Sequence, residues 1–308
     1  MISKKLLVVL LTIAIISTAA IVLGCTSPTP TPTAVPTGSP TPAPLSGTIK
    51  ISGSTTIQPV SEALARAFHN NNTGVEIPVQ GGGSGKGMTD VGNKLVDIGS
   101  ASEAVPNSTM QQFPDLKVFQ IGASAVVVIV NSADNVNSIS KDDLAKLYNG
   151  VTGDKPAAFS GFTVYKRAET SGTADTFSSY VLNNKSLVYT AAETQGANGN
   201  PGIVDAVASA PKSIGFADYG FAVANPKVKI IGIVNGSTIY PAPTRDNLLK
   251  VLKSTDTTLY PVGLTRPLNY ITNGQPTPLV QAYIDYVLSS SATWAFDQNG
   301  FFSMQDLK

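Results

Sequence analysis

The stretch TIKISGSTTIQPVSEALARAFH, residues 48–69, decides the fold class. It opens with a short strand-like run, Thr48–Ser52, and passes through Gly53 and three hydroxyl residues. Apolar residues then recur over Pro59–His69 at i, i+3, i+4, i+7 and i+8, the spacing of a helix with one buried face. The segment therefore predicts a strand, a glycine-hydroxyl turn and a helix.

The same alternation continues along most of the chain. We expect further strands at 75–79, 118–121, 125–130, 163–166, 214–217 and 228–234. We expect helices through Met88, Val91 and Leu95, and at 142–148, 173–182, 201–209, 245–252 and 278–288. About 260 residues exceed what one core comfortably holds, so the pattern predicts an α/β protein with two lobes. Each lobe is expected to be a mixed, mainly parallel sheet flanked by helices.

Composition excludes several functional classes. Of 308 residues, 42% are hydrophobic and 13% charged. The first 46 residues contain Lys4 and Lys5 and no acid, so the remainder carries 21 less 2, or 19, basic side chains against 20 acidic ones. This near-neutral body argues against nucleic-acid binding. One Cys and one His exclude a disulfide framework and a Cys/His zinc site, and we expect neither metal nor cofactor.

The N-terminus predicts export. Leu6–Leu23 is an uncharged apolar run behind two lysines, and Gly24-Cys25 after it resembles a prokaryotic lipobox with Cys25 as the lipidated residue. A retained membrane anchor and a simple cleaved signal are the alternatives. We therefore expect residues 1–25 to be a lipoprotein signal or membrane anchor, and every alternative exports the rest of the chain.

Residues 26–46 predict a linker. Thr26–Pro44 consists almost entirely of Thr, Pro, Ser, Ala and Gly, with seven prolines. Such a composition cannot bury a core and favours an extended, polyproline-like chain. We expect it to separate the globular body from the membrane.

Three glycine-hydroxyl turns precede three of the predicted helices, and they lie at 53–56, 81–87 and 167–173. A helix N-terminus has unpaired N–H donors and a partial positive charge, so it suits an anion. In open α/β sheets, ligands bind at the carboxyl ends of strands, where these turns lie. The alternative for any single turn is ordinary helix capping by Ser or Thr.

Familiar enzyme motifs fail in this sequence. The 81–87 loop is not a P-loop, because Gln80 stands in place of the first glycine and Gly87 in place of the magnesium-binding Ser or Thr. Lys86 stands where a dinucleotide fingerprint needs its third glycine, and where a nucleophile elbow around Ser84 needs its last. His69 is expected on a helix surface, which leaves no base for a catalytic triad. The hydroxyl-rich site therefore favours binding over turnover.

Five motifs resemble those of the phosphate-binding lipoproteins of Pst-type ABC importers, which are class II periplasmic-type solute-binding proteins. The motifs are Gly53–Thr56, Gln80–Gly85, Val96–Glu103, Arg167–Thr173 and Arg266–Leu268. The resemblance implies two lobes joined by two crossings. One lobe would comprise 47–127 plus 262–308, and the other 128–261.

The resemblance also implies a ligand site for inorganic phosphate. Carried over position by position, the binding residues are Ser54, Thr55, Thr56, Ser84, Glu103, Arg167, Ser171, Gly172 and Thr173. Glu103 stands where some members have an Asp that accepts the proton of hydrogen phosphate. A carboxylate only accepts, so it would reject fully deprotonated sulfate. If Glu103 instead faces solvent, then sulfate, arsenate, molybdate and tungstate return as candidate ligands.

The expected function is extracytoplasmic phosphate capture. The resemblance implies a monomer, tethered to the outer face of the cytoplasmic membrane, that closes on hydrogen phosphate and delivers it to an ABC permease. It would be no enzyme. Two alternatives are a phosphatase-like enzyme with Ser54 or Ser84 as nucleophile, and an adhesion or sensory protein without a ligand. We expect Glu169 to orient Arg167. Lys86 and Asp97 are expected on the surface or behind the ligand-binding residues, and Tyr165, Tyr219 and Trp294 in the core or in packing.

Overall fold

The computed structural model describes residues 44–153 and 155–308. The predicted signal or anchor at 1–25, with Cys25, lies outside the described residues, and so does the predicted linker up to residue 43. Strand β1 (Ser46–Thr48) begins at Ser46, the last residue of the predicted linker, and pairs in parallel with β3 (Gly74–Glu76). None of the helices in the described ranges is long and apolar enough to cross a membrane.

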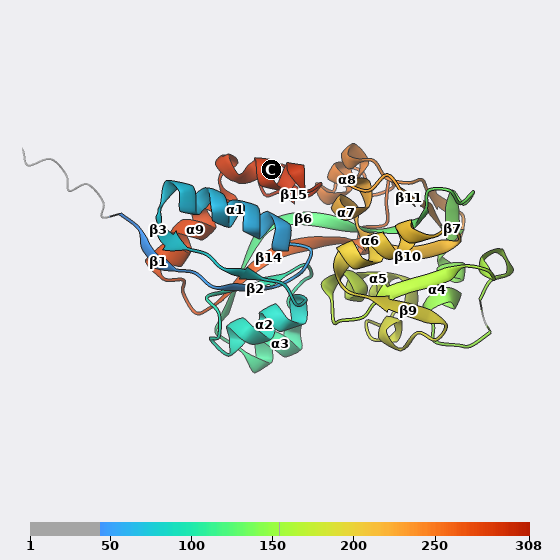
Figure 1. Ribbon diagram of the computed structural model, residues 1–308, viewed down its shortest axis with the longest axis horizontal. Helices are drawn as coiled ribbons and strands as arrows, with labels where there is room; N and C mark the ends of the chain where they lie inside the picture. Colours follow the sequence, from blue (N-terminus) through green and yellow to red (C-terminus); the bar gives the residue numbers. More distant parts are fainter. Residues whose placement is uncertain (1–43, 154) are drawn as a thin grey trace, which may run out of the picture. The chain divides into compact units, whose positions relative to one another are not determined.

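Strands and helices alternate along the described chain, as predicted (Figure 1). The other strands are β2 (Ile51–Gly53), β4 (Val79–Gln80), β5 (Ile98–Ala101), β6 (Leu116–Asn131), β7 (Ser138–Ser140), β8 (Thr163–Arg167), β9 (Thr194–Ala197), β10 (Ser213–Asp218), β11 (Val228–Ile230), β12 (Gly232–Asn235), β13 (Thr238–Tyr240), β14 (Thr265–Asn273) and β15 (Phe302–Ser303). The α-helices are α1 (Gln58–Asn71), α2 (Ser84–Gly92), α3 (Asn107–Gln112), α4 (Lys141–Tyr148), α5 (Gly172–Leu182), α6 (Gly199–Ser209), α7 (Tyr219–Val223), α8 (Arg245–Leu252), α9 (Pro278–Leu288) and α10 (Thr293–Gln298). Short 3-10 helices lie at Ala157–Phe159, Leu187–Thr190, Val262–Leu264 and Ser290–Ala292.

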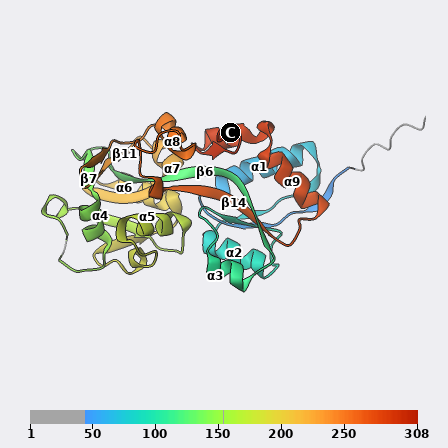
Figure 2. The ribbon, with the colours of Figure 1, turned by 180° about the vertical axis from the view of Figure 1, so that it is seen from behind.

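A large mixed sheet carries the predicted site residues. Its strand order is β4-β2-β5-β14-β6-β10-β8-β9, and β11 and β15 also pair with β6. The pairs β2–β4, β2–β5, β8–β9 and β8–β10 are parallel. At the centre, β6 is antiparallel to both β14 and β10, and the two views of the ribbon show β6 and β14 side by side (Figures 1 and 2). The predicted mixed α/β class is confirmed, and the structure adds an antiparallel centre to it.

Two main hydrophobic cores lie along this sheet. One gathers buried side chains from 125–264, together with Phe302. The other gathers them from 49–121 and from 268–301. Strand β6 passes from one core to the other, because Ala125–Val130 belong to the first core and Ile121 to the second. Strand β14 contributes Leu268 and Tyr270 to the second core, and Leu264, directly before it, belongs to the first. The two central strands therefore connect the cores, and the turns of the predicted site come from both cores.

Several predicted elements differ in detail. The runs at 118–121 and 125–130 form one continuous strand, β6. The run predicted at 75–79 is interrupted before β4 by Pro78, which lacks the N–H that a central strand donates. The run at 228–234 divides at the buried Ile231, because β11 joins β6 whereas β12 pairs with β7 and β13 in a separate sheet.

Two packing predictions are wrong. Leu95, expected on the buried stripe of a helix, is 64% exposed because α2 already ends at Gly92. Trp294, expected in packing, is 38% exposed at the start of α10. Tyr219 is buried, as expected.

Candidate functional site

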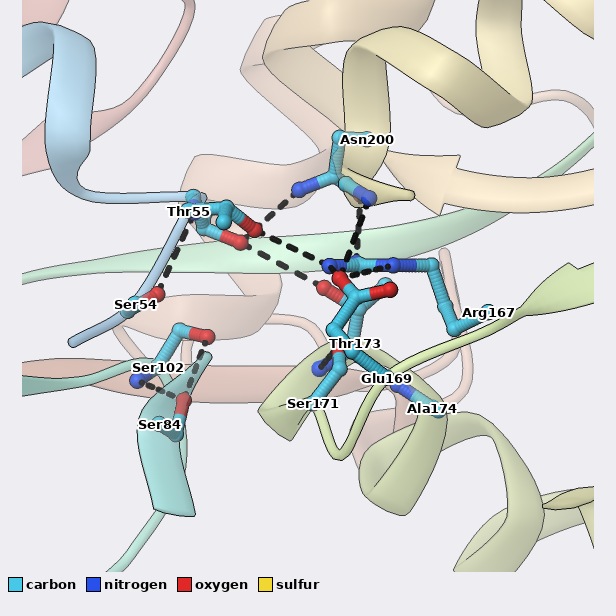
Figure 3. Close-up of polar contacts among 12 residues, drawn as sticks. Ser54, Thr55, Ser84, Ser102, Arg167, Glu169, Ser171, Thr173, Ala174 and Asn200 are labelled. Carbon is cyan, nitrogen blue, oxygen red and sulfur yellow. Dashed lines mark hydrogen bonds and ion pairs between the residues drawn. The ribbon is translucent and has the colours of Figure 1, made fainter. Parts of the chain in front are cut away.

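The predicted site residues lie where strands end and helices begin. The turns after β2, β4 and β8 lead into α1, α2 and α5, and the turn after β9 leads into α6 as a fourth junction of the same kind. β2 and β4 are parallel, as are β8 and β9, but the three antiparallel pairings between these groups make the two groups run in opposite directions. Their carboxyl ends, where ligands of α/β sheets bind, therefore approach one another from opposite sides, and Arg167 at the end of β8 contacts Thr55 after β2. Side chains from these turns point toward one another (Figure 3).

The first turn is anchored on β5. The N–H of Ser54 donates to the carbonyl of Ser100 at 3.0 Å, and the hydroxyl oxygen of Ser54 accepts the N–H of Thr56 at 3.2 Å. Gly53 has φ +135°, and a Cβ there would lie 2.2 Å from the Ser100 carbonyl, so only glycine fits. Helix α1 has no side-chain N-cap; the N–H of its first residue, Gln58, donates to the Ser54 carbonyl at 3.1 Å, and Pro59 has no N–H to donate.

The second turn brings Ser84 to the start of α2. Its side-chain oxygen accepts the N–H of Ser102 at 3.1 Å and lies 3.4 Å from the Ser102 hydroxyl oxygen. Gly83 has φ +96°, and a Cβ there would lie 2.1 Å from the carbonyl of Thr170 in the third turn. The second and third turns, from different cores, are therefore in close contact.

Arg167, the last residue of β8, joins the two cores. Its side chain is fully buried. Its Nη2 donates to Oγ1 of Thr55 at 2.9 Å, and its Nε donates to Oε1 of Glu169 at 3.0 Å. Nη2 also contacts the Glu169 carboxylate, so the expectation that Glu169 orients Arg167 is confirmed. A buried cation thus bonds the Thr55 hydroxyl of one core and the Glu169 carboxylate of the other.

The third turn supplies the cap of α5. The Ser171 oxygen accepts the N–H groups of Thr173 at 3.2 Å and Ala174 at 3.4 Å, so the capping alternative also holds for this residue. Its hydroxyl hydrogen remains free to donate. Oγ1 of Thr173 lies 3.3 Å from Oγ1 of Thr56. Gly172 packs so tightly that a Cβ there would lie 2.8 Å from both the Ser102 carbonyl and the Ser84 hydroxyl oxygen.

Glu103 is buried, which rules out the alternative that it faces solvent. Its side chain is 6% exposed, and its Oε2 accepts a hydrogen bond from Nζ of Lys185 at 3.2 Å. Within the described ranges, its carboxylate bonds Lys185 and none of the predicted hydroxyl donors. Burial, and then the negative charge of Asp175, raise the pKa of Glu103 from 4.5 to about 7, against the opposing effect of Lys185.

Further polar residues complete the site. Arg266 and Asp218 form a fully buried ion pair, with Nη2 and Oδ2 2.5 Å apart. Arg266 also donates to the hydroxyl oxygens of Ser102 and Thr56, at 3.2 Å each. The side-chain amide of Asn200 donates to the same Thr56 oxygen at 2.8 Å. These contacts connect the first two turns to the other core.

Sequence signals exist for two of these extra residues, Asn200 and Asp218. Asn200 lies at the fourth strand-to-helix junction, and Asp218 ends β10 directly before α7. The strand-end rule that selected the other turns applies to both. Arg266 belongs to the Arg266–Leu268 motif, which assigned it to the family resemblance but gave it no contact in the site. Lys185 follows α5 in a loop, and no local pattern marks it.

Neither a metal nor a histidine base is near these groups. Among the described residues, no group of three His, Cys, Asp or Glu side chains could hold a metal ion. His69 lies near the end of α1, about 16 Å along the helix from its start at the site. Lys86 pairs with Asp90, and Asp97 accepts the N–H of Lys50, so both serve local structure.

A cleft leads to the buried groups. It has a volume of about 580 Å³, and its walls include Thr55, Glu62, Glu169 and Gly199. Thr55 and Glu169 belong both to this cleft and to the network around Arg167. The remaining residues of that network are at most 2% exposed; they are Ser54, Thr56, Ser84, Arg167, Ser171, Thr173 and Asn200.

Comparisons with known proteins agree with this architecture. A family model described as a PBP superfamily domain matches residues 38–291. A curated relative, the phosphate-binding protein PstS of Bacillus subtilis, is 26% identical over 270 residues, covering 85% of this chain and 83% of the relative. Its counterpart in Borreliella burgdorferi is 24% identical over 269 residues, covering 83% of this chain and 90% of the relative.

Solved structures share the fold. A crystal structure described as a phosphate ABC transporter substrate-binding protein with bound phosphate, from Clostridium perfringens, has a TM-score of 0.69 at 22% identity, covering 83% of this chain and 99% of that one. An ABC-type phosphate transport receptor from Vibrio cholerae has a TM-score of 0.64 at 23% identity, covering 83% of this chain and all of that one.

Proposed function

The chain belongs to the PBP superfamily, and from this premise we propose that it binds hydrogen phosphate outside the cytoplasm for an ABC importer. The observation that carries the proposal is a fully buried arginine, Arg167, at the meeting point of four strand-to-helix junctions, three of which supply hydroxyl groups and the fourth the Asn200 amide. The relative from Bacillus subtilis is named a phosphate-binding protein, and its match extends over most of both chains.

The chemistry of the junctions favours an oxyanion. The uncapped start of α2 presents N–H groups, and Ser84, Ser171 and Thr173 keep hydroxyl hydrogens that can donate. Arg167 adds a delocalised positive charge whose fork suits a tetrahedral anion. Donors that are already in place replace the water lost by the ion, without a large cost of ordering.

Glu103 gives the site a preference for phosphate. Hydrogen phosphate carries a P–OH that can donate, whereas sulfate offers only acceptors. The buried carboxylate stands beside Ser102, which contacts Ser84. An ionised Glu103 would therefore accept the phosphate proton and repel sulfate.

The ion pair between Lys185 and Glu103 favours a second candidate. If Lys185 satisfies the carboxylate fully, Glu103 no longer requires a proton from the ligand. The same scaffold would then bind a fully deprotonated oxyanion such as sulfate, molybdate or tungstate.

The proposed mechanism is capture by closure, without chemistry. The two cores separate by bending about β6 and β14, the anion enters through the cleft, and the turns close on it. The site holds no histidine base, so we propose that the chain is a binding protein and no enzyme. It acts as a monomer on the outer face of the cytoplasmic membrane, held there through Cys25 or the N-terminal segment, and delivers phosphate to a permease.

Calorimetric titration tests this function. Phosphate is added to the full-length chain near neutral pH, with sulfate, molybdate and tungstate in parallel. We expect micromolar or tighter phosphate binding, and sulfate binding that is weaker and disappears as the pH rises above the Glu103 pKa of about 7. Arg167→Ala should abolish phosphate binding, and Arg66→Ala, at an exposed position of α1, should not. Strong molybdate or tungstate binding instead would support the second candidate, and silence from every anion would overturn both.

A further inference from the structure

We infer that Arg266 is a positioning residue that fixes the direction in which the site's hydroxyl groups donate. Arg266 lies in β14, is 3% exposed, and contacts one hydroxyl from each of two turns. The inference rests on the proposed function and deepens it, because it explains how neutral hydroxyl groups become dependable donors to an anion.

The two acceptor positions of Thr56 are both occupied. Its Oγ1 receives the Asn200 amide at 2.8 Å and Nη2 of Arg266 at 3.2 Å. A hydroxyl oxygen has two lone pairs, so no acceptor position remains. Thr56 must therefore act as a donor, either to Oγ1 of Thr173 at 3.3 Å or to a bound anion.

The orientation of Asn200 is equally fixed. Its Oδ1 receives the backbone N–H of Asp218 at 3.0 Å and Nη1 of Arg167 at 3.4 Å. Both partners only donate, so the oxygen of the amide must face them and the NH₂ group must face Thr56. The amide cannot turn around to accept from the Thr56 hydroxyl.

A second path leads to Ser84. Nη1 of Arg266 donates to Ser102 Oγ at 3.2 Å, which polarises that hydroxyl and makes it the better donor of the Ser102–Ser84 pair. Ser84 then accepts both the hydroxyl and the backbone N–H of Ser102. With its lone pairs filled, Ser84 directs its own hydrogen outward to the ligand.

Asp218 holds Arg266 in this position. Its carboxylate pairs with Nη2 of Arg266 and accepts the Ser124 hydroxyl at 2.6 Å and the Gly220 N–H at 3.2 Å. Nε of Arg266 is buried without a hydrogen-bond partner in the described part of the chain. The guanidinium is therefore placed so that it bonds Ser102, Thr56 and Asp218, while its Nε–H makes no hydrogen bond in the described part of the chain.

A double-mutant cycle tests the inference, with inorganic phosphate titrated calorimetrically into the full-length chain. Arg266→Lys keeps the charge beside Asp218, but one ammonium nitrogen cannot reach Thr56 and Ser102 together. We expect it to weaken phosphate binding about tenfold in the unaltered chain and only about threefold in a Thr56→Val background, where the path through Ser102 is the one still lost. Arg66→Lys, at an exposed site on α1, is the matched control.

Ser102→Ala provides a second cycle that leaves the Arg266–Asp218 pair intact. We expect the loss of phosphate affinity from Ser102→Ala to be coupled to that from Ser84→Ala and additive with that from Thr56→Val. If Arg266→Lys does not give a cooperative thermal melt, this second cycle is the one that tests the inference. Equal losses from Arg266→Lys in both backgrounds, or additivity of Ser102→Ala with Ser84→Ala, would overturn the inference alone. Failure of the unaltered chain to bind phosphate would overturn the proposed function, and this inference with it.

Discussion

Nζ of Lys185 lies 3.2 Å from Oε2 of Glu103, and the two residues come from opposite sides of the site. Glu103 follows β5, whereas Lys185 follows α5. The carboxylate is 6% exposed and the lysine side chain 52% exposed, so a solvated cation neutralises a buried acid. Burial nevertheless dominates, because the pKa of Glu103 is raised to about 7. Its protonation state therefore changes close to neutral pH.

Selection between phosphate and sulfate should depend on pH. The ionised Glu103 accepts a phosphate proton and repels sulfate, whereas the protonated carboxyl can donate to sulfate. Because the pKa of Glu103 is about 7, we expect sulfate affinity to rise about tenfold or more between about pH 8 and about pH 5.5. Calorimetric titration with sulfate at a series of pH values measures this.

Glu103→Gln should remove that dependence, since its amide can donate at every pH. Glu62→Gln is the matched control, because Glu62 lines the cleft and bonds Gln58 without contacting the buried hydroxyls. A sulfate profile that stays flat in the unaltered chain would show that Glu103 does not contact the anion.

The stability of the unliganded protein should fall as pH rises toward neutrality. The pKa of Glu103 rises from 4.5 to about 7, so between these values the folded chain binds more protons than the unfolded chain. The free energy of unfolding then decreases with increasing pH, by on the order of 3 kcal/mol at most, and levels off above about pH 7. Urea unfolding at several pH values measures the slope. Glu103→Gln should flatten it, and an unchanged slope in that variant would contradict the assignment.

Much of the fold could be predicted because its signals are local. The apolar spacing over Pro59–His69 predicted α1, and the run at 163–166 predicted β8. The antiparallel centre of the sheet could not be predicted, since pairing of β14 with β6 joins segments more than a hundred residues apart. The prediction that Leu95 is buried on a helix was wrong for a related reason, because the helical spacing of apolar residues continues in the sequence after α2 has ended at Gly92.

The candidate site divides in the same way. A turn of glycine and hydroxyl residues between a predicted strand and a predicted helix is a local pattern, so Ser84 and Thr173 could be selected from the sequence. The contacts that orient them could not be predicted, because they are long-range: Asn200 lies 144 residues from Thr56, and Arg266 lies 210 residues from it. The opposing cation Lys185 has no sequence signal, because its role depends only on where the loop after α5 lies.

Arg167 should be the largest single contributor to anion binding. Arg167→Lys keeps the charge, but one ammonium nitrogen cannot reach Glu169, Thr55 and an anion together. We expect phosphate affinity to fall about a hundredfold, since charged hydrogen bonds in a buried site are lost. Titration calorimetry measures the loss, and Arg245→Lys, which keeps a surface ion pair with Asp297, is the control. A loss within about threefold would show that Arg167 serves packing rather than the ligand.

Gly172 should control closure of the site. A Cβ at this position would lie 2.8 Å from the Ser102 carbonyl and from the Ser84 hydroxyl oxygen, so alanine would hold the second and third turns apart. Alanine is favourable within a helix, so α5 itself should not suffer. We therefore expect Gly172→Ala to lower phosphate affinity about tenfold or more while the melting temperature without phosphate changes little. Gly161→Ala is the matched control, because a Cβ there would meet only Lys212 side-chain atoms at 3.6 Å. Equal phosphate affinity in the Gly172 and Gly161 variants would mean that tight contact between these turns is not needed for binding.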